Sequence, residues 1–144
     1  MHHAITTEIE IDAPPTDVWA ALTDLDHYAE WNPFITEAAG EVKVGERLTN
    51  RLQPPGERAM TFRPEVTVVE PNETFEWLGH LGVSGVFDGR HRFALTELPD
   101  GRTRLVQSEQ FSGLLVRLMR KRLDGGTVAG FEAMNEALAA HVTK

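Results

Sequence analysis

Polar and apolar positions alternate at the start of the chain. Ile5, Thr7, Ile9 and Ile11 fall on one side of an extended backbone, and the residues between them are acidic or hydroxylic. This period of two predicts a half-buried strand. Prolines at positions 14 and 15 end it, because proline removes a main-chain donor.

Two short helices are predicted next. The first carries Val18, Trp19 and Leu22 on one face. The second is expected over residues 25–30, and it stops because Pro33 disfavours a helical conformation at the residue before it.

The middle of the chain reads as about six antiparallel strands separated by turn residues. The predicted strands cover residues 35–44, 46–53, 58–70, 74–81, 86–98 and 103–111. Pro64 lies inside the third of these, which predicts a bulge or an edge position. Pro99, Asp100 and Gly101 form a strong hairpin signal between the last two.

The period changes to threes and fours in the last third of the chain. The apolar positions are Leu114, Leu115, Leu118, Met119, Leu123, Val128, Phe131, Met134, Leu138 and Val142. They predict one long amphipathic helix, or two segments hinged at Gly125 and Gly126. An antiparallel sheet with one apolar face needs a cover, and only this helix is long enough. The expected fold class is therefore α+β.

Composition narrows the function classes. The 144 residues predict a single domain over residues 1–144, and the net charge of −8 disfavours nucleic acid as a partner. The absence of Cys excludes disulfides, thiolate metal sites and a cysteine nucleophile. No apolar run approaches the roughly 20 residues of a transmembrane helix. The N-terminal residues lack the pattern of a secretory signal, so the expected location is cytoplasmic.

Motif searches give no cofactor and no metal site. The sequence contains no dinucleotide or phosphate-binding glycine motif and no H-E-x-x-H zinc motif. His2 and His3 are expected at a frayed chain start. We expect a monomer or a weak homodimer.

Four segments resemble the START/birch-pollen-allergen-like (SRPBCC) superfamily, closest to its polyketide cyclase/dehydrase-like branch. They are YAEWNPFI (residues 28–35), FDGRHRFAL (87–95), TRLVQSEQFSG (103–113) and GFEAMNEAL (130–138). The resemblance implies a helix-grip fold, a curved antiparallel sheet wrapped around the C-terminal helix. It also implies a cavity between sheet and helix that holds a hydrophobic small molecule.

The candidate ligand-binding residues are aromatic and apolar side chains with a few polar anchors. They are Trp31, Phe34, Asn50, Met60, Phe62, Phe75, Trp77, Phe93, Gln107, Phe111, Phe131 and Met134. Most of these would equally serve as core. A lined cavity with few polar groups is, however, how ligand pockets are built.

His91 and Glu109 are the candidate catalytic pair. If the hairpin is centred on Asp100, His91 pairs with Glu109 and Phe93 with Gln107, and the preceding turn places Trp77 beside His91. A carboxylate on an apolar face needs a partner, and an imidazole is a suitable one. The pair is either a satisfied cross-strand contact or an acid–base group, and a register slip of one residue would separate it.

Three functions remain open on the sequence. The leading one is binding of a hydrophobic or aromatic, lipid- or polyketide-like molecule. The second is a cofactor-independent cyclase or dehydratase that uses His91 and Glu109, and the third is a chaperone-activator-like interaction module. A basic cluster of Arg117, Arg120, Lys121 and Arg122 suits either a solvated helix face or a patch for an anionic ligand group or membrane surface.

Overall fold

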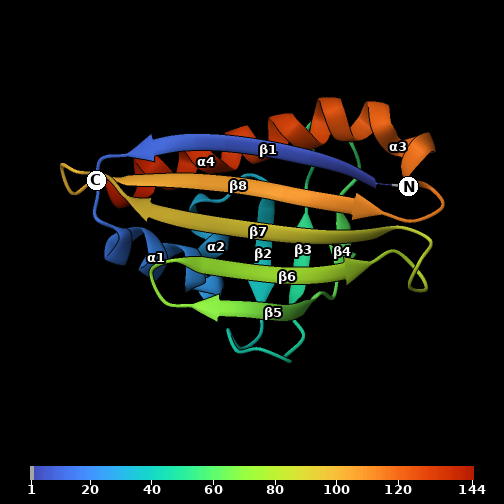
Figure 1. The fold of residues 1–144 in the computed structure, drawn as a ribbon, viewed down its shortest axis with the longest axis horizontal. Coiled ribbons are helices and arrows are strands. Elements are labelled where there is room, and N and C mark those ends of the chain that lie inside the picture. The colour runs from blue at the N-terminus through green and yellow to red at the C-terminus, as the bar shows by residue number, and fades with distance from the viewer. Residues whose placement is uncertain (1) are drawn as a thin grey trace.

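The computed structural model describes residues 2–144 and confirms the helix-grip α+β fold (Figure 1). The strands are β1 (His2–Ile11), β2 (Ile35–Ala39), β3 (Thr49–Leu52), β4 (Met60–Phe62), β5 (Glu65–Glu70), β6 (Thr74–His80), β7 (Asp88–Glu97) and β8 (Thr103–Ser112). The helices are α1 (Pro15–Thr23), α2 (Tyr28–Trp31), α3 (Val116–Arg122) and α4 (Val128–Val142), with a 3-10 turn η1 (Leu25–His27) and a π-helical turn η2 (Leu123–Thr127).

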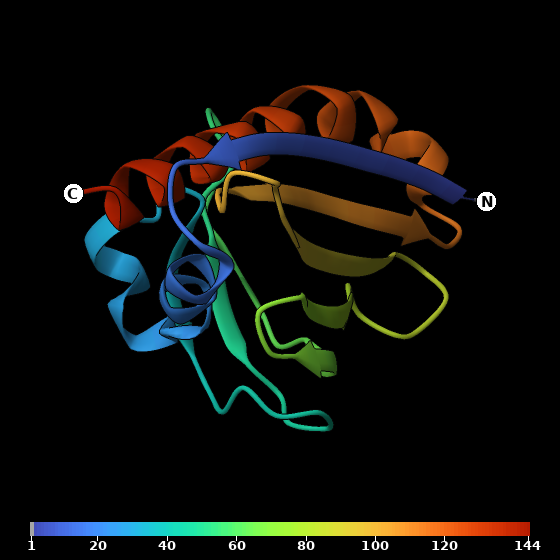
Figure 2. The same ribbon diagram turned by 60° about the vertical axis from the view of Figure 1, so that its left-hand side comes forward.

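The strands form two antiparallel sheets that face each other. The larger has the order β1-β8-β7-β6-β5, and the smaller has the order β2-β3-β4. The smaller sheet lies behind the larger one, with its strands crossing at a steep angle (Figure 1). α4 runs along β1 and β8, and the short helices α1 and α2 lie at one end of the sheets (Figure 2). The concave side of the large sheet is thus covered by α4 and the small sheet together.

β1 shows the predicted alternation and also corrects one expectation. Ile5, Thr7 and Ile11 are buried and Ile9 is half-buried, whereas Thr6, Glu8 and Glu10 are exposed. His3, expected at a frayed start, is instead part of the strand and pairs with Phe111. The strand reaches back to His2 because β8 offers an equally long edge for pairing.

The long strand predicted over residues 58–70 is wrong, because the chain breaks at Pro64 and its halves join different sheets. β4 pairs with β3, and β5 pairs with β6. Pro64 has no N–H to give to a ladder, yet its carbonyl accepts from Leu48 N at 2.9 Å. Other boundaries shift less: the strand predicted over residues 35–44 ends at Ala39, and the second helix divides into η1 and α2.

The C-terminal helix is one continuous run from α3 through η2 to α4. The glycine pair lies inside the π-helical turn, so it loosens the helix without breaking it. On α4, Phe131, Met134 and Leu138 are buried while Glu132 is exposed, as the periodicity predicts. No helix within residues 2–144 is long and apolar enough to cross a bilayer.

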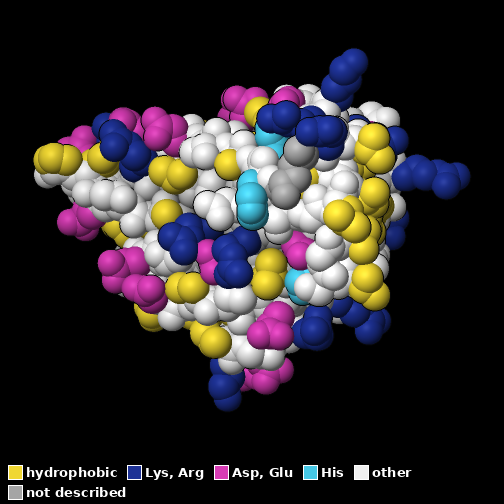
Figure 3. All heavy atoms as spheres, turned by 45° about the vertical axis from the view of Figure 1, so that its right-hand side comes forward, with side chains coloured by type: hydrophobic (Ala, Val, Ile, Leu, Met, Phe, Trp, Pro, Cys, Tyr) yellow, Lys and Arg dark blue, Asp and Glu magenta, His cyan; other side chains and the backbone are white. Residues whose placement is uncertain are grey.

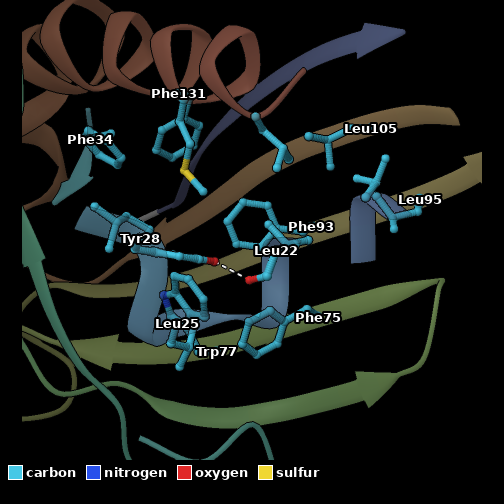
Figure 4. Close-up of a cluster of buried hydrophobic side chains, with 14 of the residues drawn as sticks. Leu22, Leu25, Tyr28, Phe34, Phe75, Trp77, Phe93, Leu95, Leu105 and Phe131 are labelled. Carbon is cyan, nitrogen blue, oxygen red and sulfur yellow. Dashed lines mark hydrogen bonds between the residues drawn. The ribbon is translucent and has the colours of Figure 1, made fainter. Parts of the chain in front are cut away.

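Aromatic side chains fill the core beside α1 and α2 (Figure 4). Phe75 and Phe93 are fully buried and lie against each other on neighbouring strands. The Tyr28 hydroxyl donates a hydrogen bond to the Leu22 carbonyl oxygen, and burial raises the pKa of the phenol far above its usual value. Tyr28 therefore stays a protonated donor and ties α2 to α1.

Gly130 lets α4 approach Phe34, the residue directly before β2. A Cβ atom at this position would lie 2.4 Å from Cδ1 of Phe34, a buried ring. We expect Gly130→Ala to lower the free energy of unfolding by about 1–3 kcal/mol through overpacking, although alanine favours a helix. Gly125→Ala is the matched control, because nothing lies within 4 Å of the new methyl group. Denaturant unfolding measures both, and equal stabilisation by the two changes contradicts this packing.

Candidate functional site

A cavity of about 130 Å³ lies between the two sheets and the helical run α3–η2. Its wall combines side chains from all three units: Phe34, Ile35, Asn50, Leu52, Met60, Phe62, Trp77, Phe87, His91, Glu109, Phe111, Met119 and Leu123. Most of this wall is apolar. The cavity therefore has the composition expected for a small-molecule site, with few polar groups to fix an orientation.

The cavity has a buried floor and an exposed rim. Phe34, Asn50 and Trp77 are buried, whereas Met60 and Leu81 are among the exposed large hydrophobic residues of the protein. Arg122 and Glu57 also line it and form an ion pair of 3.3 Å. The opening therefore lies between β4, the connection after β6 and the end of α3.

Two glycines create the space. Gly79 and Gly89 face each other across β6 and β7, and both line the cavity. They occupy the inward positions next to Trp77 and His91, so the inner face lacks two side chains at this point. Glycine inside a strand is typical of such a close approach or gap. The two glycines were not among the predicted site residues, although the hairpin register places them opposite each other.

The structure brings six of the predicted ligand-binding residues to the cavity wall. They are Phe34, Asn50, Met60, Phe62, Trp77 and Phe111, and the candidate catalytic residues His91 and Glu109 join them. The other six lie outside the wall: Trp31, Phe75, Phe93, Gln107, Phe131 and Met134.

Packing explains why those six are elsewhere. Trp31 stacks on His141 at the end of α4, with ring centroids 5.6 Å apart. Phe75 and Phe93 are fully buried, and the Phe75 ring packs edge-on against Trp19 of α1. Phe131 and its neighbour Met134 are buried under α4, and the Phe131 ring lies 4.8 Å from the ring of His91, behind the cavity.

The cross-strand row of Trp77, His91 and Glu109 that the two hairpins predict is confirmed. Trp77 pairs with His91 across β6 and β7, and His91 pairs with Glu109 across β7 and β8. The Trp77 and His91 rings stack with centroids 4.9 Å apart. His91 Nδ1 lies 3.0 Å from Glu109 Oε1.

A buried chain of hydrogen bonds fixes the proton on the other nitrogen of His91. The Thr7 hydroxyl donates to the main-chain carbonyl of Gln107 (2.9 Å), so its oxygen accepts from Asn135 Nδ2 (2.9 Å). Asn135 Oδ1 then faces Gln107 Nε2, which donates to it at 2.7 Å and to the Phe131 carbonyl at 3.3 Å. Gln107 Oε1 is left 2.9 Å from His91 Nε2. An amide oxygen only accepts, so Nε2 carries a hydrogen.

One transferable proton follows from this arrangement. With Nε2 protonated, the contact between His91 Nδ1 and Glu109 Oε1 has two forms. Either an imidazolium donates to a carboxylate, or a neutral ring accepts from a protonated carboxyl group. Glu109 lines the cavity and is 16% exposed, so the pair can exchange that proton with a bound molecule.

Glu109 differs from Glu76, a carboxylate that is buried more deeply. Burial acts to raise the pKa of Glu76, but hydrogen bonds from Thr67, Arg92 and Arg90 hold it below its usual value. That group is a fixed anion on the outer face of the sheet. Glu109 has one protein partner among the described residues, so it keeps acceptor capacity for a ligand.

Asn50, a residue of the cavity wall, has one side-chain oxygen that is fully buried and, among the described residues, unsatisfied. The residue is 2% exposed and lines the wall, and its Oδ1 has no hydrogen-bond partner among residues 2–144. Such an orphaned acceptor costs about 1–3 kcal/mol of stability unless a ligand supplies a donor. Among the same residues, no three His, Asp or Glu side chains come together in a way that could hold a metal ion.

Comparison with protein families gives one match over almost the whole chain. The family model described as "Polyketide cyclase / dehydrase and lipid transport" matches residues 2–143. No curated protein is significantly similar to this sequence.

Solved structures share the fold. A protein from Mesorhizobium loti is 26% identical, with a TM-score of 0.72 over 96% of this chain and 95% of that one. The Zhui aromatase/cyclase from a Streptomyces species is 18% identical, with a TM-score of 0.77 over 99% of this chain and 94% of that one. Norcoclaurine synthase from Thalictrum flavum, solved in complex with dopamine and hydroxybenzaldehyde, is 15% identical, with a TM-score of 0.77 over 99% and 87%.

The hydrogen-bond chain makes Gln107 a structural hub. Gln107→Leu leaves His91 Nε2, Asn135 Oδ1 and the carbonyl of Phe131 without this partner in a buried region. We expect a loss of about 3 kcal/mol or more in the free energy of unfolding, since each orphaned buried group costs about 1–3 kcal/mol. Gln110→Leu, at an exposed position of the same strand, is the control and stays within about 0.5 kcal/mol. Equal denaturation midpoints for the two variants are incompatible with the hub.

Proposed function

Because this chain belongs to the polyketide cyclase/dehydrase and lipid transport family, we propose that it binds a small aromatic molecule bearing a hydroxyl group in the cavity between sheets and helix. The apolar wall supplies the affinity, and the polar groups select the hydroxyl. The proposal concerns the class of ligand, and the observation that carries it is the orphaned oxygen of Asn50.

The volume of the cavity supports a ligand of about one ring. A cavity of about 130 Å³ is close to the ~150 Å³ that accommodates benzene in a dry protein interior. It is smaller than the ~300–1,000 Å³ of sites that enclose drug-sized ligands. A larger molecule would place one ring inside and extend past Met60 and Leu81 at the rim.

The polar groups of the wall support a hydroxyl donor. Asn50 Oδ1 accepts but has no donor, and Glu109 is an acceptor when ionised. A purely apolar ligand would leave Asn50 Oδ1 without a partner and Glu109 with His91 as its one partner, which costs free energy. A phenol satisfies one of them and places its ring against Trp77 and Phe111.

One structural neighbour has ligands of this size and chemistry. Norcoclaurine synthase was solved with dopamine and hydroxybenzaldehyde, each of which has one ring and at least one phenolic hydroxyl. The identity of 15% limits the likeness to the fold. That a protein of this fold was solved in complex with one-ring phenols supports the proposal.

Asn50→Leu separates ligand selection from stability. The change keeps the side-chain volume and removes the orphaned oxygen, so we expect the free energy of unfolding to stay equal or rise by up to about 1 kcal/mol. Affinity for 4-hydroxybenzaldehyde should fall about tenfold, while affinity for benzaldehyde should not fall. Titration of the intrinsic tryptophan fluorescence, to which the cavity residue Trp77 contributes, measures both affinities.

Arg51→Leu is the matched control, because Arg51 is the exposed neighbour of Asn50 on β3. It should leave both affinities unchanged. An equal loss for both aldehydes in Asn50→Leu, or no binding of either by the wild-type protein, would contradict the proposed selection of a hydroxyl group.

A second function, acid–base catalysis of cyclisation or dehydration, is favoured by the pair His91 and Glu109 in the cavity wall. The Glu109 carboxylate would take a proton from the carbon next to a ligand carbonyl group. The resulting carboxyl group would give that proton to a departing hydroxyl, so that water leaves and a double bond forms. His91 would orient the carboxyl group and share the proton through Nδ1.

Two variants test this second function. With a small β-hydroxy aryl ketone as probe, we expect Glu109→Gln to lower the dehydration rate about 100-fold, a typical contribution of a general acid–base group. Gly89→Ala should lower it as well, because the new Cβ would lie 2.1 Å from Glu109 Oε2 and displace the carboxylate. Glu97→Gln, an exposed change on the same sheet, is the control. Absence of any rate enhancement by the wild-type protein leaves ligand binding alone.

A further inference from the structure

Three aliphatic side chains at one end of the molecule are far more exposed than such residues usually are. Leu114 is 83% exposed, Leu118 79% and Val83 71%. Leu118 lies on α3, and Leu114 lies in the turn directly before this helix. Val83 belongs to the connection between β6 and β7. We call these residues together with the exposed basic residues of α3 the apical patch.

The two segments of the patch are held together by the main chain. Leu114 N donates to the Gly85 carbonyl at 3.1 Å, and Leu115 N donates to the Val86 carbonyl at 2.9 Å. The Asp88 carboxylate accepts from Gly85 N at 3.0 Å. The apolar side chains are therefore displayed by a fixed loop and a helix start that support each other.

The patch is strongly basic in an acidic protein. Residues 114–123 contain Arg117, Arg120, Lys121 and Arg122 and no acidic residue, while the whole chain carries a net charge of −8. All four basic residues are exposed. Along the right edge of Figure 3, hydrophobic side chains form a band, and Lys and Arg side chains project beside it.

The inner face of the same elements forms the cavity wall. Met119 and Leu123 line the cavity from the helical run, and Leu81 and Phe87 line it from the connection between β6 and β7. The inner side of α3 therefore contributes to the cavity wall. Its outer side exposes Leu118 to solvent and carries four basic side chains.

We propose that the apical patch docks the protein on an anionic lipid bilayer, with the mouth of the cavity at the membrane surface. Leu114, Leu118 and Val83 would enter the boundary between headgroups and acyl chains, and the basic side chains would contact lipid phosphates. Exposed apolar residues alone would suit many partners. Their combination with a local positive charge in an acidic chain selects a negatively charged apolar surface, which an anionic bilayer is.

The proposed docking depends only on the apical patch and not on the proposed function. That the docked protein exchanges its aromatic or lipid-like ligand with the membrane rests on the proposed function. In this arrangement an apolar ligand would pass between the bilayer and the cavity beside Met119 and Leu81, with little exposure to water.

Vesicle binding tests the inference with the full chain. We expect the protein to co-sediment with vesicles of equal parts phosphatidylglycerol and phosphatidylcholine, and to bind pure phosphatidylcholine vesicles about tenfold more weakly or less. Raising the salt from about 0.05 M to about 0.5 M should release it, because screening weakens the contribution of the charges.

Two double variants separate the contributions. Leu114→Ser/Leu118→Ser removes apolar insertion, and Arg117→Glu/Lys121→Glu reverses two charges; each should lower the partition coefficient about tenfold. The matched controls are Val44→Ser, exposed on the connection between β2 and β3, and Arg51→Glu, exposed on β3. Both controls should bind vesicles like the wild-type protein. None of the variants changes a residue of the cavity wall, so each should still bind 4-hydroxybenzaldehyde.

The outcomes distinguish the two proposals. Vesicle binding that is lost in both double variants and kept in both controls supports docking, even if no aromatic ligand binds. No binding to anionic vesicles, or binding that the double variants leave unchanged, overturns it. A third result would also overturn docking: the protein does not bind vesicles but forms a concentration-dependent dimer, and the leucine double variant abolishes that dimer. The patch would then be an interface between copies of this chain.

Discussion

The buried hydrogen-bond chain from Thr7 to His91 is the constraint on which the site depends. It joins β1, β8, α4 and β7, and it passes through a region that is otherwise apolar. A hydrogen-bonded side chain in such a region has one arrangement that satisfies all groups and many that do not. The position of α4 over the sheet and the direction of the His91 ring are therefore fixed together. Any ligand proton chemistry is confined to the remaining nitrogen.

The cavity begins where this satisfied chain ends. Beyond His91, the inner face carries Gly79 and Gly89 where other strand positions carry large side chains, so the two sheets are not filled between them. The polar groups at this boundary are Glu109, with one protein partner, and Asn50, whose oxygen has none among the described residues. A core that served only stability would be expected to fill the gap and satisfy both groups. The contrast with the fully paired Glu76 supports ligand binding as the reason for this local composition.

The sequence predicted what depends on local chemistry. The alternation of β1, the helical period of α4 and the register of the two hairpins were all readable, because Pro99, Asp100 and Gly101 form a short turn that leaves little freedom in pairing. The cavity wall was only half predicted. Whether an aromatic residue lines a cavity or fills the core depends on how closely two sheets and a helix approach, and no periodicity encodes that distance. Phe75 and Trp77 have the same parity on one strand, yet only Trp77 reaches the cavity. The single strand predicted through Pro64 was wrong for a related reason. Proline lacks a main-chain N–H both where a strand bulges and where the chain passes from one sheet to another, so the sequence does not distinguish the two cases.

The apical patch and the cavity would both limit the contact of an apolar ligand with water. An apolar ligand that leaves a closed cavity into water exposes its full surface, and the free energy of that exposure grows with its area. A mouth on the same elements that carry the exposed leucines and valine would shorten the path through water, and the basic residues of α3 would direct that mouth toward a negatively charged surface. The excess of acidic residues elsewhere in the chain adds to the effect, since repulsion from an anionic surface disfavours every other orientation. The uneven distribution of charge would thus select which face of the molecule meets the membrane.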